Sequence, residues 1–369
     1  MTASDDKYQA GVTAAVARGI GKQSLRHEIL FVSLAQNHST ARRKIAQAAG
    51  TGANVAIYDA KVNKNKASIR RRAISGVYAK LLQFLLFSSR EEIWWFWGAD
   101  VCLVGTLAGL LRPSRIIIWD ISDVQHRLLG KSVLSRLLRT VEAALIKRCQ
   151  RLVLSSDAFW NNYYSRRVPA ERVSIIENLL EGSPPQVSRL PPTDTLNIIY
   201  SGIIRSDALM RLILDSAALC QGGATFHLWG SFHPAIRRAT LDEIERNTNV
   251  IYHGPYDERD LESLYGDMHV TFGMVDIDAN DNERWLLSNR LYQAGAFRCP
   301  IVATRGSKVG EAAAERKLGW VLDNDCGQMA VLLTSLLNDP KAYLEAVHSM
   351  PDQKQFYFSN EYSTLLASL

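Results

Sequence analysis

The feature that most constrains this chain is a repeated alternation between short apolar segments and helical patterns. In the first half, segments rich in Ile and Val lie at 29–34, 55–58, 93–96, 116–119 and 152–155, and helical patterns lie at 39–49, 101–110 and 134–147. Short apolar strands that alternate with helices are typical of a parallel sheet covered by helices on both faces. The pattern therefore predicts an α/β fold.

The alternation stops at a segment rich in proline and polar residues, 181–194, which has the composition of a linker. It then restarts with apolar segments at 196–200, 225–229, 250–252, 270–272, 301–303 and 320–322. A chain of 369 residues is also too long for one ordinary core. We expect two doubly wound, Rossmann-like domains that face a cleft, at 27–180 and 195–352. Residues 1–26, with little apolar pattern, form an N-terminal extension, and residues 353–369 form a C-terminal segment.

Composition and cysteine usage favour a soluble, reduced, cytoplasmic protein. Apolar residues make up 47% and charged residues 22% of the chain, an ordinary globular composition. The five cysteines are scattered and lack the spacing of metal ligands. No apolar run is long enough to cross a bilayer, and the N-terminus, with Asp5, Asp6 and Lys7, lacks the layout of a signal peptide.

The charge is distributed unevenly along the chain. Residues 1–180 hold 27 Lys and Arg against 13 Asp and Glu, a net +14, and residues 181–369 hold 16 against 24, a net −8. The densest cationic cluster, Lys61, Lys64, Lys66 and Arg70–Arg72, leads into a helical pattern with one apolar face. A solvated start of a core helix explains this cluster, and so does an amphipathic segment that docks on an anionic membrane surface.

The segment 288–303 reads as a polar helix start, a short helix and a buried strand. Ser288 and Asn289 can cap the helix, whose free N–H groups and positive dipole end attract phosphate. Arg290 in the first turn adds a permanent charge that can bind a diphosphate in bidentate fashion. The alternative is an ordinary amphipathic helix whose apolar residues are core positions.

This segment resembles the P-S-K-L-x-E-Y-x-A-x-G-x-P-V-V-A segment of family-4-like glycosyltransferases with the GT-B fold. Within that group it is most similar to bacterial exopolysaccharide glycosyltransferases of the succinoglycan type. Arg290 stands at the Lys position and Gln293 at the acidic position, where a glutamine can still hydrogen-bond a ribose hydroxyl. The family's other acidic residue is replaced by Trp285. Glu283 or Asp281 can take its place, or the stretch 273–284 is a solvated acidic loop.

The resemblance also assigns donor-binding roles to residues after three strands of the second half. These are Gly202 with Arg205, Gly230, and His253 with Gly254. Glycine at these points lets the backbone approach a diphosphate, and ligands of open parallel sheets bind at the carboxyl ends of the strands. Glycines there serve turns without a ligand as well.

In the first half, Asp120 and Asp123 follow the segment 116–119, where relatives carry a Y-x-x-H-D type motif. A carboxylate there can take the proton that an acceptor hydroxyl loses. Asp123 is the first candidate, Asp120 the second and His126 the third. Either aspartate can instead cap the helix that follows. We interpret Glu142 as structural.

The resemblance implies a hexosyltransferase that moves a sugar from a nucleotide diphosphate to a lipid-linked saccharide at the inner membrane face. It implies no metal and no cofactor, and a C-terminal segment 353–369 that crosses back to the first domain. A sugar-nucleotide epimerase of the same fold is one alternative. A nucleic-acid-binding protein is another, but the aromatic residues Trp94, Trp95 and Trp97 lie in or beside a buried strand, so we expect no nucleic-acid partner.

Overall fold

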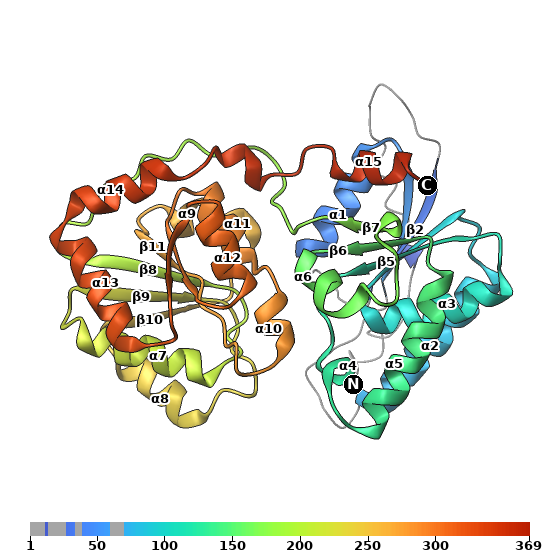
Figure 1. The fold of residues 1–369 in the computed structure, drawn as a ribbon, viewed down its shortest axis with the longest axis horizontal. Helices are drawn as coiled ribbons and strands as arrows, with labels where there is room; N and C mark the ends of the chain where they lie inside the picture. Colours follow the sequence, from blue (N-terminus) through green and yellow to red (C-terminus); the bar gives the residue numbers. More distant parts are fainter. Residues whose placement is uncertain (1–11, 14–26, 34–38, 60–69) are drawn as a thin grey trace, which may run out of the picture. The chain divides into compact units, whose positions relative to one another are not determined.

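The computed structural model describes residues 12–13, 27–33, 39–59 and 70–369. The chain divides into two compact units, each built around its own sheet (Figure 1). Unit 1 comprises Met1–Glu177 and Ser359–Leu369, and unit 2 comprises Asn178–Phe358. The predicted α/β fold with two sheets is confirmed. The segment 181–194 lies within unit 2, so the chain leaves unit 1 before the proline-rich stretch begins.

The sheet of unit 1 has the order β1-β3-β2-β4-β5-β6-β7. Its strands are β1 Val12–Thr13, β2 Glu28–Ser33, β3 Asn54–Asp59, β4 Ile93–Trp97, β5 Ile116–Ile121, β6 Arg151–Leu154 and β7 Val173–Ile175. All neighbours pair in parallel except the short edge strand β1, which is antiparallel to β3. Strands β2, β4 and β5 are apolar and almost fully buried, as expected for the centre of a parallel sheet.

Helices cover both faces of this sheet. They are α1 Ser39–Gly50, α2 Arg70–Phe87, α3 Ala99–Leu111, α4 His126–Leu129, α5 Val133–Leu145, α6 Asp157–Phe159 and α15 Glu361–Ala367, with short turns η1 Ile146–Arg148, η2 Trp160–Tyr164 and η3 Ala170–Arg172. Figure 1 shows α1 and α15 on one side and α2, α3 and α5 on the other. Helix α3 lies so close to the sheet that a Cβ at Gly105 would come within 2.2 Å of the Phe96 ring.

Unit 2 contains a six-stranded parallel sheet of order β10-β9-β8-β11-β12-β13. Its strands are β8 Leu196–Ser201, β9 Ala224–Trp229, β10 Val250–Gly254, β11 Val270–Phe272, β12 Ile301–Thr304 and β13 Gly319–Leu322. Its helices are α7 Asp207–Leu219, α8 Arg238–Arg246, α9 Leu261–Tyr265, α10 Asp281–Trp285, α11 Asn289–Ala296, α12 Lys308–Glu315, α13 Cys326–Asn338 and α14 Pro340–Ser349, with turns η4 Glu258–Asp260 and η5 Gln353–Phe356. One core packs under α7, α8, α13 and α14, and a second packs on the other face under α9, α11 and α12.

The end of the chain is shared between the units. Phe356 packs in the unit-2 core near Gly295, whereas Tyr362 of α15 stacks on Trp95 of unit 1 with ring centroids 5.4 Å apart. Of the predicted C-terminal segment 353–369, only the part from Ser359 onward belongs to unit 1. Among the described helices, none is both long and apolar enough to cross a membrane.

Candidate functional site

Three glycines line the carboxyl edge of the unit-2 sheet. Gly202, Gly230 and Gly254 have φ angles of 126°, 135° and 88°, a region that favours glycine. The Gly202 N–H donates to the Trp229 carbonyl at 2.9 Å, and the Gly230 N–H donates to the Gly254 carbonyl at 2.8 Å. A Cβ at Gly230 would lie 1.7 Å from the Gly202 carbonyl oxygen, whereas Cβ positions at Gly202 and Gly254 face open space. The outer two glycines therefore leave the backbone open to a ligand.

Arg290 is a nearly buried cation at the start of α11. Its side chain is only 8% exposed, its Nη2 donates to the Met274 carbonyl at 3.3 Å, and its guanidinium carbon lies 4.1 Å from the Tyr200 ring centroid. Its Nη1 is buried, and within the described part of the chain neither a hydrogen-bond acceptor nor a carboxylate partners it. A buried charge without a counter-charge is costly. This position is therefore suited to an anionic ligand.

Ser288 precedes this helix and differs from its predicted role. It occupies the N-cap position of α11, but its hydroxyl accepts no capping hydrogen bond. Ser288 Oγ is instead buried without a partner among the described residues, and Asn289 is the half-buried first residue of the helix. The start of α11 thus holds two unpaired buried donors, Ser288 Oγ and Arg290 Nη1, next to free helix N–H groups.

Gln293 is held by an internal network that the sequence did not reveal. Its Oε1 accepts hydrogen bonds from Ser201 Oγ at 2.6 Å and from the Tyr265 hydroxyl at 3.2 Å. Tyr256 joins the same network, and burial raises the pKa of its hydroxyl. The Gln293 oxygen is therefore engaged inside unit 2, and its amide N–H groups are what remains for a ligand. Of the residues that bind Gln293, Ser201 lies directly before the predicted Gly202 at the end of β8, so its position in the sequence pointed to the site.

His253 lies in an aromatic stack on β9 and β10. Its ring is parallel to that of Trp229, with centroids 4.1 Å apart, and its Nε2 lies 3.0 Å from His227 Nδ1. Burial and the neighbouring His253 lower the pKa of His227 to about 4, and burial lowers the pKa of His253. Both rings are therefore neutral near pH 7, and the stack presents an uncharged flat surface.

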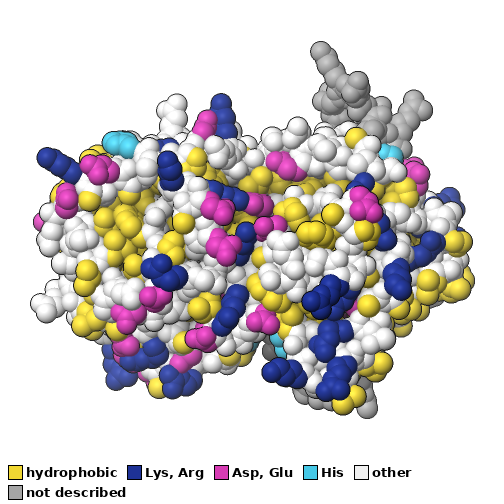
Figure 2. Space-filling model, viewed as in Figure 1, with side chains coloured by type: hydrophobic (Ala, Val, Ile, Leu, Met, Phe, Trp, Pro, Cys, Tyr) yellow, Lys and Arg dark blue, Asp and Glu magenta, His cyan; other side chains and the backbone are white. Residues whose placement is uncertain are grey.

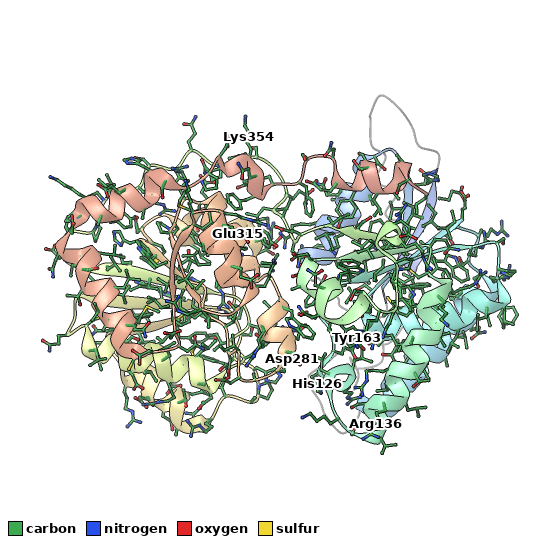
Figure 3. All side chains as sticks on the ribbon, viewed as in Figure 1. His126, Arg136, Tyr163, Asp281, Glu315 and Lys354 are labelled. Atoms are coloured by element: carbon green, nitrogen blue, oxygen red, sulfur yellow. The ribbon has the colours of Figure 1, made fainter. Side chains whose placement is uncertain are left out.

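The acidic stretch after β11 is ordered by its own contacts. Asp276 accepts a hydrogen bond from Ser206 Oγ at 2.6 Å, and Asn280 caps the unpredicted helix α10 by accepting from the Glu283 backbone N–H at 3.2 Å. Glu283 is half-buried in the first turn of α10, beside Asp281, which Figure 3 labels. Arg205 is exposed between β8 and α7. The last part of the stretch 273–284 is therefore the start of a helix, while Asp278 and Asp281 are exposed, and both alternatives for this stretch stay open.

In unit 1, the side chain of Asp120, the second candidate for the proton acceptor, is fully buried. Its Oδ1 lies 2.5 Å from Lys44 Nζ, both side chains are fully buried, and Trp95 Nε1 donates to Oδ2 at 3.1 Å. Burial raises the pKa of this carboxyl, and Lys44 opposes the increase. Because it is sealed inside the unit and bound to a cation, Asp120 cannot take a proton from a substrate.

Asp123 and His126 are exposed beyond the end of β5 (Figure 3 labels His126). The N-cap of α4 is Gln125, so neither predicted aspartate caps that helix. Glu142 is buried and accepts hydrogen bonds from Tyr163 at 2.7 Å and Tyr164 at 3.1 Å, as its structural interpretation predicts. Asp123 is therefore the carboxylate of this pair that solvent and a substrate can reach.

We compared the sequence and the structure of the chain with those of known proteins. No family model matches the chain. It is 26% identical over 246 residues to the succinoglycan biosynthesis protein ExoL of Rhizobium meliloti (strain 1021), a match covering 62% of this chain and 59% of that protein. The crystal structure of Anabaena Alr3699/HepE in complex with UDP and glucose matches with a TM-score of 0.68 and 15% identity, over 93% of this chain and 100% of that one. The chain has the GT-B fold.

Two further GT-B matches bear on the alternatives. The lipopolysaccharide outer core galactosyltransferase WaaB matches with a TM-score of 0.60 and 11% identity, over 92% of this chain and 98% of that one. The UDP-GlcNAc 2-epimerase from Neisseria meningitidis matches with a TM-score of 0.57 and 12% identity, over 92% and 99%. Since the GT-B fold carries both kinds of protein, the side chains of the site have to distinguish them.

Proposed function

We propose that this GT-B chain is a glycosyltransferase that moves a sugar from a nucleotide diphosphate to an acceptor hydroxyl in exopolysaccharide synthesis. The similarity to ExoL and to a protein bound to UDP and glucose supports this proposal. The observation that carries it is the buried guanidinium of Arg290, which has no counter-charge among the described residues. A diphosphate at the start of α11 supplies that counter-charge.

The proposed reaction exchanges one bond at the sugar carbon. The bond to the diphosphate oxygen breaks, the bond to the acceptor oxygen forms, and the acceptor proton passes to Asp123 or to the leaving phosphate. Negative charge grows on the nucleoside diphosphate as it leaves, and Arg290 with the N-terminus of α11 stabilises that charge. These groups take the role that a metal plays in other transferases, so the proposal includes no metal or cofactor. The open backbone at Gly202 and Gly254, with His253, contacts the rest of the donor.

Calorimetry with UDP, GDP, dTDP and their sugars tests the donor site. We expect one nucleotide to stabilise the protein by about 2.7 kcal/mol at about 100 times its dissociation constant. Arg290→Ala removes charge-assisted hydrogen bonds, and we expect about 10- to 100-fold weaker binding of that nucleotide. Arg246→Ala, on the exposed end of α8, is the matched control and keeps full affinity. A folded Arg290→Ala protein with unchanged affinity would exclude Arg290 from the site.

The epimerase remains the second candidate because a UDP-GlcNAc 2-epimerase shares the fold. Epimerisation needs several acid and base groups that converge on the sugar. Burial of Asp120 against Lys44 removes one of the two carboxylates that the sequence offered in unit 1. Incubation of nucleotide sugars without an acceptor separates the two activities. Only an epimerase inverts the configuration of a sugar ring carbon under those conditions.

We also propose that the acceptor is a lipid-linked saccharide at the inner membrane face. The cluster Lys61, Lys64 and Lys66 lies outside the described residues, and although Arg70–Arg72 begin α2, their side chains are not among those described. Docking through this cluster therefore stays a prediction. Sugar transfer to a lipid-linked oligosaccharide, but not to the free oligosaccharide, would support a lipid-linked acceptor.

A further inference from the structure

Helix α5 turns much of its apolar surface outward. Ser135, Glu142 and, in its last turn, Leu145 are buried, whereas Val133 and Leu137 on its outward face are 79% and 58% exposed. An amphipathic helix of a globular protein normally turns its apolar face to the core. The outward apolar face of α5 therefore needs an explanation outside the core of unit 1.

Polar side chains of α5 form hydrogen bonds within unit 1, and these contacts fix the orientation of the helix. Arg139 Nη1 donates to the carbonyls of Leu128 and Gly130, each at 2.7 Å. Glu142 accepts the hydrogen bonds of Tyr163 and Tyr164. Turning the helix over would bury Val133 and Leu137 but would break these hydrogen bonds. Such a rotation is unfavourable, because buried polar groups left without partners are costly.

The neighbouring helix α3 extends the apolar surface. It packs beside α5, and Leu107, Leu110 and Leu111 in its last turns are exposed, Leu111 at 71%. We define the α3–α5 surface by six residues: Leu107, Leu110, Leu111, Val133, Leu134 and Leu137. Scattered apolar side chains are normal on a protein surface, whereas six exposed apolar residues on two adjacent helices mark a candidate interaction site.

Cationic residues predominate in the part of the chain that forms α4 and α5. Between residues 125 and 148 the chain has six Lys and Arg and one acid, Glu142, which is buried. Figure 2 shows Lys and Arg side chains gathered over the part of unit 1 where Figure 1 places α4 and α5. Lys131 and Arg136 are exposed next to Val133, Leu134 and Leu137. Apolar and cationic side chains that alternate along an exposed helix are typical of helices that lie in a membrane interface.

We propose that the α3–α5 surface docks unit 1 on a bilayer that contains anionic phospholipid. Val133, Leu134 and Leu137 enter the boundary between headgroups and acyl chains, and Lys131 and Arg136 face lipid phosphates. This surface differs from the cluster 61–72 that the sequence singled out. The inference deepens the proposed function by bringing unit 1 to the membrane that carries the acceptor, but docking itself needs no donor.

Flotation of the full-length protein with vesicles tests this surface. We expect binding to vesicles of phosphatidylcholine and phosphatidylglycerol at 2:1, weak binding to pure phosphatidylcholine, and loss of binding as salt rises. Leu134→Gln with Leu137→Gln lowers the partition coefficient at least about tenfold. Lys131→Gln and Arg136→Gln each lower it about fivefold on the anionic vesicles. Val331→Gln on α13 of unit 2, where the valine is 72% exposed, is the matched control and leaves it unchanged.

The outcomes separate docking from sugar transfer. All α5 variants keep the thermal stabilisation by the nucleotide that binds the wild type, and Arg290→Ala keeps vesicle binding. Vesicle binding that is absent in the wild type, equal on neutral vesicles or unchanged in the double leucine variant would overturn the proposal. A concentration-dependent dimer that the double leucine variant abolishes, without vesicle binding, would assign the surface to a second copy of the chain instead.

Discussion

At the scale of single residues, the two aspartates after β5 have opposite surroundings and therefore opposite expected phenotypes. Asp120→Asn leaves the fully buried Lys44 without its partner, and we expect it to lower the free energy of unfolding by about 3–5 kcal/mol. Asp123→Asn changes an exposed side chain, so it keeps stability and lowers turnover by about 10²–10⁴-fold if Asp123 takes the proton. Urea unfolding and single-turnover transfer measure the two effects.

The double variant Lys44→Met with Asp120→Asn is the control, since it removes both buried charges and is expected to recover part of the lost stability. An Asp120→Asn protein that is as stable as the wild type but inactive would return the catalytic role to Asp120. Full activity in both single variants would exclude a carboxylate base.

The sequence points to candidate residues where the local pattern suggests a role, and it fails where the role depends on distant partners. Arg290 was singled out because it follows a polar helix start, and the structure buries it beside Tyr200, but its role in donor binding stays a prediction. Asp120 could not be interpreted correctly, because its partner Lys44 lies 76 positions away and only the folded sheet brings them together. The network of Gln293 with Ser201 and Tyr265 was hidden for the same reason.

At the scale of elements, the three glycines at the edge of the unit-2 sheet are not equivalent. Gly230→Ala would place a Cβ 1.7 Å from the Gly202 carbonyl oxygen in addition to straining its φ of 135°. Gly254→Ala shares the positive φ but meets no neighbour, so it is the matched control. We expect Gly254→Ala to cost about 1–3 kcal/mol of stability and Gly230→Ala at least about twice as much. Equal losses in denaturant unfolding would contradict the close contact.

The elements themselves were largely predictable, because buried parallel strands are short apolar runs with clear boundaries. The central strands start and end within about two residues of their predicted positions. Strand β7 was missed because its residues are half-buried or exposed and so lack an apolar run. Strand β1, two residues long, carries no periodic signal at all. Helix α10 was missed because its acidic composition hides the cap at Asn280.

At the scale of the whole molecule, unit 1 depends on the last residues of the chain. Tyr362, Leu365 and Leu366 of α15 are buried in unit 1, and Arg151 binds the backbone of Ser368. Ending the chain after Phe358 would remove these contacts, which we expect to lower the stability of unit 1 by about 4–9 kcal/mol as an upper estimate. Unit 2 keeps all its residues, so its unfolding transition and its nucleotide binding remain.

Differential scanning calorimetry of the shortened chain measures both transitions. Thr364→Ala, an exposed position of α15, is the control and leaves the unit-1 transition in place. A shortened chain whose unit 1 unfolds at the wild-type temperature would contradict a structural role for α15.

The path of the backbone between the units also sets an order of assembly. The chain leaves unit 1 after Glu177 and returns to it at Ser359, so unit 2 is an insertion within unit 1. A ribosome delivers residues from the N-terminus, and domains generally fold as units while they emerge. Unit 2 can therefore reach its final form first. Unit 1, although most of it is made earlier, lacks the Tyr362 ring that stacks on Trp95 until residues 359–369 have been synthesised.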